Sequence, residues 1–401
     1  MLPWIYSLRL NFTFSFVLFG KCSPANAPRW RRAGRSRCGA ALCVKAARSE
    51  TWMELYTLDL GQFSTGSPAE RAAIAQAFDG AFRTAGFCYL TGYEHLLPEA
   101  TIDALRAQST AFFALPAAEK EKSRVDGEIG YLGPGAENIA ASAGAASAQP
   151  DLVESLNLPA YQEPAWHVSA AEAECPWRDE AWLPTAAFRA AAVAYFGGVN
   201  RVMTELYSLA ELALELPPST LGAAFEHPGT LLRLAWYPPC DDAEGAEGAE
   251  GAEGAEGGAG RLRYGAHTDF DGFTILQRGE EQRGGLEVQM PGGEWAAVAA
   301  PPGTLTINIG DLLQRWTNDR WKSTRHRVAR DTTPGRGRLS VVYFTGPHPD
   351  TVVECLPSPK CAPAGGGAPR YAPITAYDHV LAKMHAATAD AREAATASKN
   401  S

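Results

Sequence analysis

The amino-acid sequence predicts an α+β fold, mainly β, in which a helical N-terminal region precedes a sandwich or jelly roll of short strands. Residues 226–350 contain many short apolar runs separated by Gly- and Pro-rich turns, a pattern typical of such β folds. Residues 53–225 instead place apolar side chains at helical spacing. The 401 residues are 46% hydrophobic and 20% charged, as expected for a globular protein with a large core.

Residues 1–52 differ in composition from the rest of the chain. They contain nine Lys and Arg residues against the single acid Glu50, and a short apolar run over residues 10–19. That run is too short to cross a membrane, which takes about 20 apolar residues. The segment predicts a targeting leader, either a two-part plastid address or a secretory signal cleaved near Ala25-Asn26-Ala27. The alternative is a start placed too far upstream, with Met53 opening a cytoplasmic protein; we expect a soluble plastid or cytoplasmic protein.

The segment from residue 53 to residue 225 is the predicted N-terminal helical region. Its first helix begins at Pro68 and ends at Gly86, in agreement with the usual helix start and stop signals. Further predicted elements are a buried strand at 87–90, helices at about 98–113 and 186–214, and a strand at 151–158. The Gly-, Ala- and Ser-rich residues 127–149 predict a flexible loop, which is either a connection without a function or a loop over an active-site mouth.

Residues 226–350 are the predicted β core. The expected strands are at 231–237, 261–268, 272–277, 286–290, 295–298, 304–309 and 339–345. Five Ala-Glu-Gly repeats interrupt this region, and residues 241–260 are therefore predicted to be a disordered surface insert. Residues 351–401 complete the chain as a C-terminal helix and tail.

One set of polar residues in the β core has the composition of a metal site. His267-Thr268-Asp269 places an imidazole and a carboxylate two residues apart, on one side of a strand end. His326 follows further along the chain and can supply a second imidazole. Two imidazoles and one carboxylate, without a thiolate, bind Fe(II) on one face and leave three positions open for redox chemistry.

Further motifs surround these three residues in a specific order. They are Ala85-Gly86-Phe87, Phe112-Phe113-Ala114-Leu115-Pro116, Leu232-Arg233-Leu234, Tyr237-Pro238-Pro239-Cys240, Gly265-Ala266-His267-Thr268-Asp269, Gly284-Gly285-Leu286-Glu287-Val288, Asn308-Ile309-Gly310-Asp311, Arg315-Trp316-Thr317-Asn318, Lys322-Ser323-Thr324, His326-Arg327-Val328, Arg338-Leu339-Ser340, Pro373-Ile374-Thr375 and Asp378-His379. With these motifs, residues 54–390 resemble the isopenicillin-N-synthase-like family of Fe(II)/2-oxoglutarate-dependent dioxygenases. The resemblance implies a double-stranded β-helix (jelly-roll) core with an N-terminal helical extension and a C-terminal helix.

The resemblance also implies the ligands of the site. Fe(II) is expected on His267, Asp269 and His326, with 2-oxoglutarate and O2 as co-substrates and ascorbate as a reductant. The far carboxylate of 2-oxoglutarate is expected on Arg338 and Ser340, because a guanidinium fork and a hydroxyl suit a carboxylate. Tyr237 matches a family tyrosine that hydrogen-bonds the same co-substrate. Ala235 departs from the family, whose members commonly carry Asn at this position.

The expected reaction is hydroxylation or desaturation of a small molecule, with release of succinate and CO2. No catalytic residue is predicted beyond the ligands of the metal and of the co-substrate, since the metal carries the chemistry. Expected walls of the substrate pocket are Phe270, Phe273, Leu286, Phe344 and Tyr131.

Two other interpretations remain open. The first is an Fe(II) oxidase of the same fold that does not use 2-oxoglutarate, and the second is a non-catalytic jelly-roll binding protein. The net charge of −9 argues against sequence-independent binding to nucleic-acid phosphates. We expect a monomer with a small-molecule substrate and no nucleic-acid or membrane partner.

Overall fold

The structure is a computed structural model that describes residues 53–125, 129–140, 151–159, 182–239, 262–279, 285–329 and 337–383. The predicted leader 1–52, the predicted insert 241–260 and the tail beyond residue 383 lie outside these residues. No helix in the described ranges combines the length and the apolar character that a membrane span requires.

The larger of two main sheets has eight strands in the order β1-β2-β10-β7-β12-β5-β4-β3. In that order the strands span Thr57–Asp59, Phe87–Thr91, Leu305–Ile309, Phe273–Arg278, Arg338–Gly346, Gly229–Tyr237, Glu154–Pro159 and Gly130–Leu132. Only the β1–β2 pair among them is parallel. The predicted strand at 151–158 begins later, at Glu154, because Asp151 accepts hydrogen bonds from the backbone of Ile139 and Gly265 instead of extending β4.

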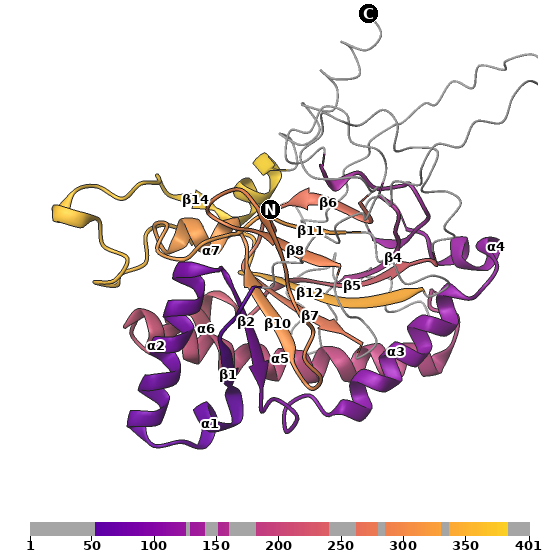
Figure 1. Cartoon of the computed structure of the whole chain (residues 1–401), viewed down its shortest axis with the longest axis horizontal. Helices are drawn as coiled ribbons and strands as arrows, with labels where there is room; N and C mark the ends of the chain where they lie inside the picture. Colours follow the sequence, from indigo (N-terminus) through magenta and orange to yellow (C-terminus); the bar gives the residue numbers. More distant parts are fainter. Residues whose placement is uncertain are drawn as a thin grey trace, which may run out of the picture.

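The smaller sheet has four antiparallel strands in the order β6-β11-β8-β9. These strands span Tyr264–His267, His326–Val328, Leu286–Gln289 and Trp295–Ala297. The small sheet lies over one face of the large sheet (Figure 1), and side chains of β8 and β2 pack together between the two. The two facing sheets form the jelly-roll core, so the predicted fold class is confirmed.

The helices are α1 Leu60–Thr65, α2 Pro68–Thr84, α3 Glu99–Phe113, α4 Ala117–Lys120, α5 Ala186–Leu214, α6 Thr220–Ala224 and α7 Asp311–Trp316, with short 3-10 turns η1 Glu121–Ser123 and η8 Ala364–Gly366. Of these, α2, α3 and α5 cover the face of the large sheet opposite the small sheet (Figure 1). The start of α2 follows from a capping box between Ser67 and Glu70, with Pro68 in the first turn. The bounds of α5 are those that the sequence predicts.

The C-terminal part returns to the core beside α7. A short pair of strands, β13 Val352–Val353 and β14 Ile374–Thr375, precedes helical residues 376–383, as expected for a C-terminal helix. Lys383 forms an ion pair of 2.8 Å with Asp311, which also accepts a hydrogen bond from Thr268. The C-terminal helical residues are therefore linked to the His267-Thr268-Asp269 segment.

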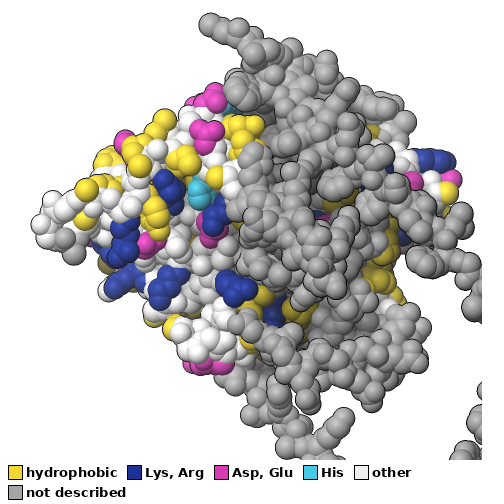
Figure 2. All heavy atoms as spheres, turned by 90° about the horizontal axis from the view of Figure 1, so that it is seen from above, with side chains coloured by type: hydrophobic (Ala, Val, Ile, Leu, Met, Phe, Trp, Pro, Cys, Tyr) yellow, Lys and Arg dark blue, Asp and Glu magenta, His cyan; other side chains and the backbone are white. Residues whose placement is uncertain are grey.

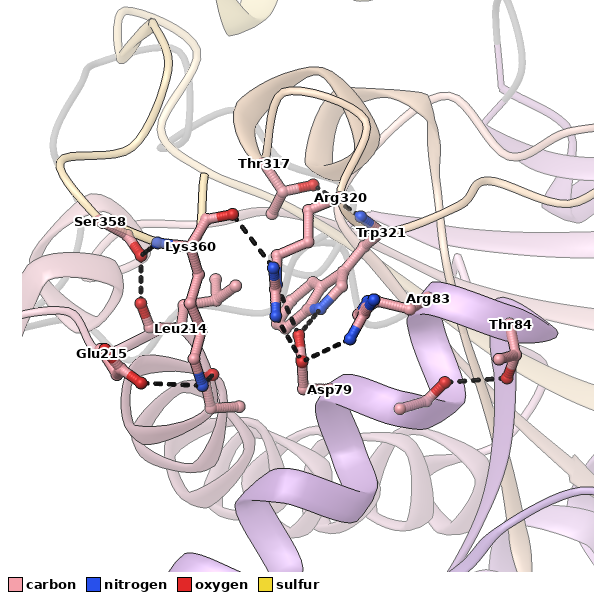
Figure 3. A network of polar contacts seen from close by, with 12 residues as sticks. Asp79, Arg83, Thr84, Leu214, Glu215, Thr317, Arg320, Trp321, Ser358 and Lys360 are labelled. Carbon is pink, nitrogen blue, oxygen red and sulfur yellow. Dashed lines mark hydrogen bonds and ion pairs between the residues drawn. The ribbon is translucent and has the colours of Figure 1, made fainter. Parts of the chain in front are cut away.

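A buried acid ties α2 to the chain that follows α7. Asp79 accepts two hydrogen bonds from the Arg320 guanidinium, at 2.7 and 2.6 Å, and one from the Trp321 indole at 3.0 Å (Figure 3). The next residue, Lys322, donates its backbone N–H to Phe82 of α2 at 2.9 Å. These contacts hold the segment that leads into His326.

Candidate metal centre

Three donor side chains converge where the small sheet meets the loop after β6. His267 ends β6, His326 begins β11, and the two residues face each other as register partners. Each imidazole Nε2 lies 3.6 Å from Asp269 Oδ1, and the three donor atoms all lie within 4.8 Å of one another. The sequence predicts these same three residues as a metal site, and the fold brings them together.

The second nitrogen of each imidazole is held by a backbone carbonyl. His267 Nδ1 lies 2.8 Å from the carbonyl oxygen of Gly265, and His326 Nδ1 lies 3.1 Å from that of Thr324. A carbonyl only accepts hydrogen bonds, so each Nδ1 carries the proton and each Nε2 presents its lone pair. Such outer contacts are usual for metal-binding histidines, because they fix the tautomer and the ring orientation.

Asp269 is oriented by two donors from the large sheet. Its Oδ2 accepts hydrogen bonds from Thr274 Oγ1 and Asn308 Nδ2, both at 2.6 Å. Thr274 and Asn308 are register partners on β7 and β10, so the sheet presents both donors to one oxygen. The other oxygen, Oδ1, faces the two imidazoles.

The protonation states suit a divalent cation. Burial, followed by the nearby His267, lowers the pKa of His326 to about 4, so this imidazole is neutral at pH 7. Burial alone would raise the pKa of Asp269, but His326, His267 and the Thr274 hydroxyl together bring it below its ordinary value. A neutral imidazole and an ionised carboxylate are the forms that bind metal ions. Two nitrogen donors and one oxygen donor on one side fit Fe(II).

The predicted co-substrate residues lie along the inner face of β12 and β5. Arg338 pairs with Tyr237, and its guanidinium carbon lies 4.6 Å from the centre of the tyrosine ring. Ser340 pairs with Ala235, so a methyl group lies directly beside the predicted hydroxyl ligand. Arg338, Ser340 and Tyr237 are all buried.

A glycine leaves the room that Arg338 occupies. Gly285 has a φ of +87°, which favours glycine, and a Cβ built on it would overlap Arg338 Nη1. Gly285 therefore has a steric role at the guanidinium that faces the co-substrate region.

Three of the five predicted pocket residues lie close to the donor cluster. Phe344 is half-buried on the face of β12 that carries Arg338 and Ser340. Leu286 belongs to the cluster between the sheets, which includes Phe87, and the Phe87 ring meets the His326 ring edge to face at 5.6 Å. Phe270 directly follows Asp269 and is half-buried.

The prediction is wrong for the other two, Phe273 and Tyr131, because both point to the helical side of the large sheet. Phe273 is fully buried and its ring contacts Phe78, Phe82 and Trp321 in the main core. Its neighbour Thr274 takes the inner face, since successive side chains on a strand alternate. Tyr131 packs against Phe112 in the same core and donates a hydrogen bond of 2.7 Å to Glu154.

Several residues of the site were not predicted. Asn308 and Thr274 hold Asp269, and both are buried polar residues within strands. A buried polar residue needs a partner, so this pattern is a usable signal. Arg233, which is buried, and Glu137, which is half-buried, form an ion pair of 2.7 Å. Nothing local in the sequence pairs two residues so far apart in the chain.

A separate cavity of about 570 Å³ lies outside the barrel, beside α2. Asp79, Arg83, Arg320 and Lys360 are among the residues that line it, and Figure 3 shows these four side chains together. Asp79 takes part in ion pairs with both arginines, and Lys360 forms one with Glu215. The lining includes none of the three donor residues, so this cavity is distinct from the candidate metal centre.

Two facing sheets that hold two histidines and one carboxylate define a class of proteins, the non-haem iron oxygenases of the jelly-roll fold. The chain belongs to the 2OG-Fe(II) oxygenase superfamily, whose sequence profile matches residues 228–347. The profile described as the N-terminal part of the non-haem dioxygenases in morphine synthesis matches residues 55–179.

Individual relatives agree with this assignment. The chain is 30% identical to a validamycin A dioxygenase of Streptomyces hygroscopicus subsp. limoneus over 78% of this chain and 80% of that protein. It is 31% identical to a proline hydroxylase of Petromyces alliaceus over 76% of this chain and 91% of that protein. The structure of a full-length Neurospora crassa protein in complex with α-ketoglutarate (2-oxoglutarate) superposes with a TM-score of 0.65 at 25% identity, covering 82% of this chain and 96% of the fungal one.

The protein is thus a 2-oxoglutarate-dependent dioxygenase that uses Fe(II) as cofactor and 2-oxoglutarate and O2 as co-substrates. It hydroxylates or desaturates a small molecule and releases succinate and CO2.

Proposed function

We propose that His267, Asp269 and His326 bind the Fe(II) of this dioxygenase. The observation that carries the proposal is the convergence of their donor atoms within 4.8 Å, with each non-donor atom already held by the protein. Bound Fe(II) supplies O2 activation coupled to decarboxylation of 2-oxoglutarate and oxidation of a substrate C–H bond. The protein's own part is to orient the ligands and to keep the site dry.

We further propose that Arg338, Ser340 and Tyr237 hold the far carboxylate of 2-oxoglutarate. The three side chains share the inner face of neighbouring strands, and a guanidinium binds a carboxylate through two parallel hydrogen bonds. Ala235 presents only a methyl group beside Ser340, so this end of the co-substrate depends on Arg338 and Ser340. No acid–base residue is assigned, and Phe270, Leu286 and Phe344 are the proposed pocket walls.

The test is substrate-independent turnover of 2-oxoglutarate. The purified protein, with Fe(II), ascorbate as reductant and O2, should release succinate slowly, and His267→Ala, Asp269→Ala and His326→Ala should each abolish the release. A matched control is His95→Ala, since His95 is exposed and its Nδ1 lies 3.1 Å from the backbone carbonyl oxygen of Gly92. Wild-type-like succinate release by any of the three variants removes that residue from the ligand set. No release by the wild type, with or without candidate substrates, favours the oxidase or the binding-protein interpretation.

The partners and the location of the protein belong to the same proposal. On the coloured part of the face in Figure 2, white and yellow surface separates dark-blue Lys and Arg side chains, and magenta acids lie next to some of them. This mixed pattern and the net charge of −9 support a small-molecule enzyme without a nucleic-acid or membrane partner. A monomer in the plastid or the cytoplasm is proposed. Size-exclusion chromatography tests the first point and a fluorescent fusion of residues 1–52 tests the second.

A further inference from the structure

Cross-strand pairing arranges the inner face of the large sheet in rows. Asn308, Thr274 and Phe344 form one row, in which the Asn308 and Thr274 side chains donate hydrogen bonds to Asp269, the proposed metal ligand. Ser340 and Ala235 lie in a row nearer the co-substrate arginine. The row between these two contains Val342 of β12, Arg233 of β5 and Asn157 of β4. Arg233 therefore lies between the metal row and the co-substrate row.

One aromatic ring, that of Tyr264, separates Arg233 from the proposed metal ligand His267. Its guanidinium carbon lies 5.3 Å from the centre of the Tyr264 ring, and that ring lies 5.1 Å from the His267 ring. Arg233 shares the strand face of Tyr237, because residues an even number of positions apart on a strand point the same way. It is only 8% exposed.

Arg233 is paired with Glu137, and its guanidinium has more hydrogen-bond donors than its described contacts use. Arg233 Nη2 donates to Glu137 Oε2 at 2.7 Å, and Nη1 donates to Asn157 Oδ1 at 3.4 Å. Glu137 Oε1 accepts from Ser155 Oγ at 2.7 Å, and Oε2 also accepts from the Tyr264 hydroxyl at 3.5 Å. A guanidinium has five N–H donors, and the bonds of Arg233 within the described residues use two of them. The guanidinium thus retains donors for a further ligand.

The pair is poorly explained as a device for stability. Arg233 is buried and Glu137 is half-buried, so desolvation of the two charges offsets much of their attraction, and a packed apolar pair is often as stable or more stable. The helical face of β5, by contrast, is lined with leucines such as Leu232 and Leu234. Burial lowers the pKa of Arg233, but the charge of Glu137 outweighs it, and the guanidinium stays protonated. A permanent cation beside the metal site is suited to binding an anionic group.

We propose that Arg233 binds a carboxylate of the prime substrate and thereby sets which C–H bond faces the metal. The substrate is then a small carboxylic acid. Glu137 orients the guanidinium by accepting a hydrogen bond from one of its edges. The negative charge of Glu137 also weakens the attraction between Arg233 and the substrate carboxylate. This inference rests on the proposed function, since it needs the metal and 2-oxoglutarate in the places assigned to them.

The test compares matched acids and amides on the whole protein loaded with Zn(II) and 2-oxoglutarate. The probes are L-proline with L-prolinamide and phenylacetate with phenylacetamide, and their dissociation constants are measured by ligand-observed NMR. The wild type should bind the acids at least about tenfold more tightly than the amides, a difference of about 1.4 kcal/mol. Arg233→Gln should remove this preference. Glu137→Gln should increase it, because the competing negative charge is gone.

Arg201→Gln is the matched control, since Arg201 is an exposed arginine that binds the backbone of Leu96. This variant should retain the preference for acids. Equal binding of acids and amides by the wild type, including no binding of either, overturns the proposal. A preference that survives in Arg233→Gln also overturns it.

Two further measurements separate this inference from the proposed function. If Arg233→Gln weakens 2-oxoglutarate as much as it weakens the acids, Arg233 is a co-substrate ligand and the inference fails. If the wild type binds neither metal nor 2-oxoglutarate, the proposed function itself fails. Should Arg233→Gln not fold, Arg233→Lys keeps the charge without the planar fork, and its preference for acids should be weaker than that of the wild type.

Discussion

The hydroxyl of Thr274 allows a quantitative test of how the large sheet holds Asp269, the proposed metal ligand. Thr274→Val keeps the shape of the side chain but removes the 2.6 Å hydrogen bond to Oδ2, while Asn308 still donates to the same oxygen. A buried hydrogen bond to a charged group contributes about 1.5–3 kcal/mol. Loss of such an outer contact typically lowers metal affinity about 10–100-fold, which corresponds to about 1.4–2.7 kcal/mol.

Isothermal titration of the metal-free protein with Mn(II) or Co(II) measures this loss directly. Thr345→Val is the matched control, because Thr345 is a buried threonine whose hydroxyl donates to the backbone carbonyl of Phe273, at 3.3 Å, and not to Asp269. The control should keep wild-type metal affinity. Thr274→Val within twofold of the wild type, or an equal loss in Thr345→Val, would refute the reasoning that the sheet orients Asp269.

Three other predictions concern the co-substrate contact of Arg338, the burial of His379 in the C-terminal helix, and the ion pair between Asp79 of α2 and Arg320. Arg338→Lys should raise the KM for 2-oxoglutarate about tenfold or more, since an ammonium cannot form the two-pronged contact; succinate release against co-substrate concentration measures it, and an unchanged KM contradicts it. Burial lowers the pKa of His379 to about 4, below its unfolded value of about 6.5, so the folded state should lose stability as the pH falls from 6.5 towards 4. His379→Gln should make the melting temperature less dependent on pH across that window, and an identical dependence counts against the assignment. Asp79→Asn should lower the free energy of unfolding by about 2–3 kcal/mol in urea, because the Arg320 guanidinium loses its carboxylate partner; a change below about 0.5 kcal/mol would show that the ion pair is dispensable.

Elements with strong local signals were predicted closely. The start of α2 at Pro68 and the bounds of α5 follow from capping residues and apolar spacing, which act within a few residues of each other. The strand predicted at 151–158 illustrates the limit. Its alternating pattern suits β structure from the first residue, but the Asp151 carboxylate binds the backbone of Ile139 and Gly265 and delays β4.

The pocket residues show why the face of a strand is harder to predict than its existence. Phe273 and Thr274 are neighbours, and a shift of one residue exchanges which of them faces the metal. The sequence alone offers an aromatic and a hydroxyl at adjacent positions, and its predicted pocket wall is the aromatic, Phe273. The pairing of β7 with β10 and β12 places the hydroxyl inside and the ring in the helical core.

By itself, the sequence determined the chemical types at the site: two imidazoles and one carboxylate with the composition of a metal site, and an Arg-x-Ser pair that the family resemblance predicts to bind a carboxylate. The tertiary structure alone decided how these groups are aimed. Carbonyls at Gly265 and Thr324 set the imidazole tautomers, and donors from two other strands select one oxygen of Asp269. It also brought Glu137, in the chain after β3, to Arg233 of β5, a contact between residues distant in the sequence.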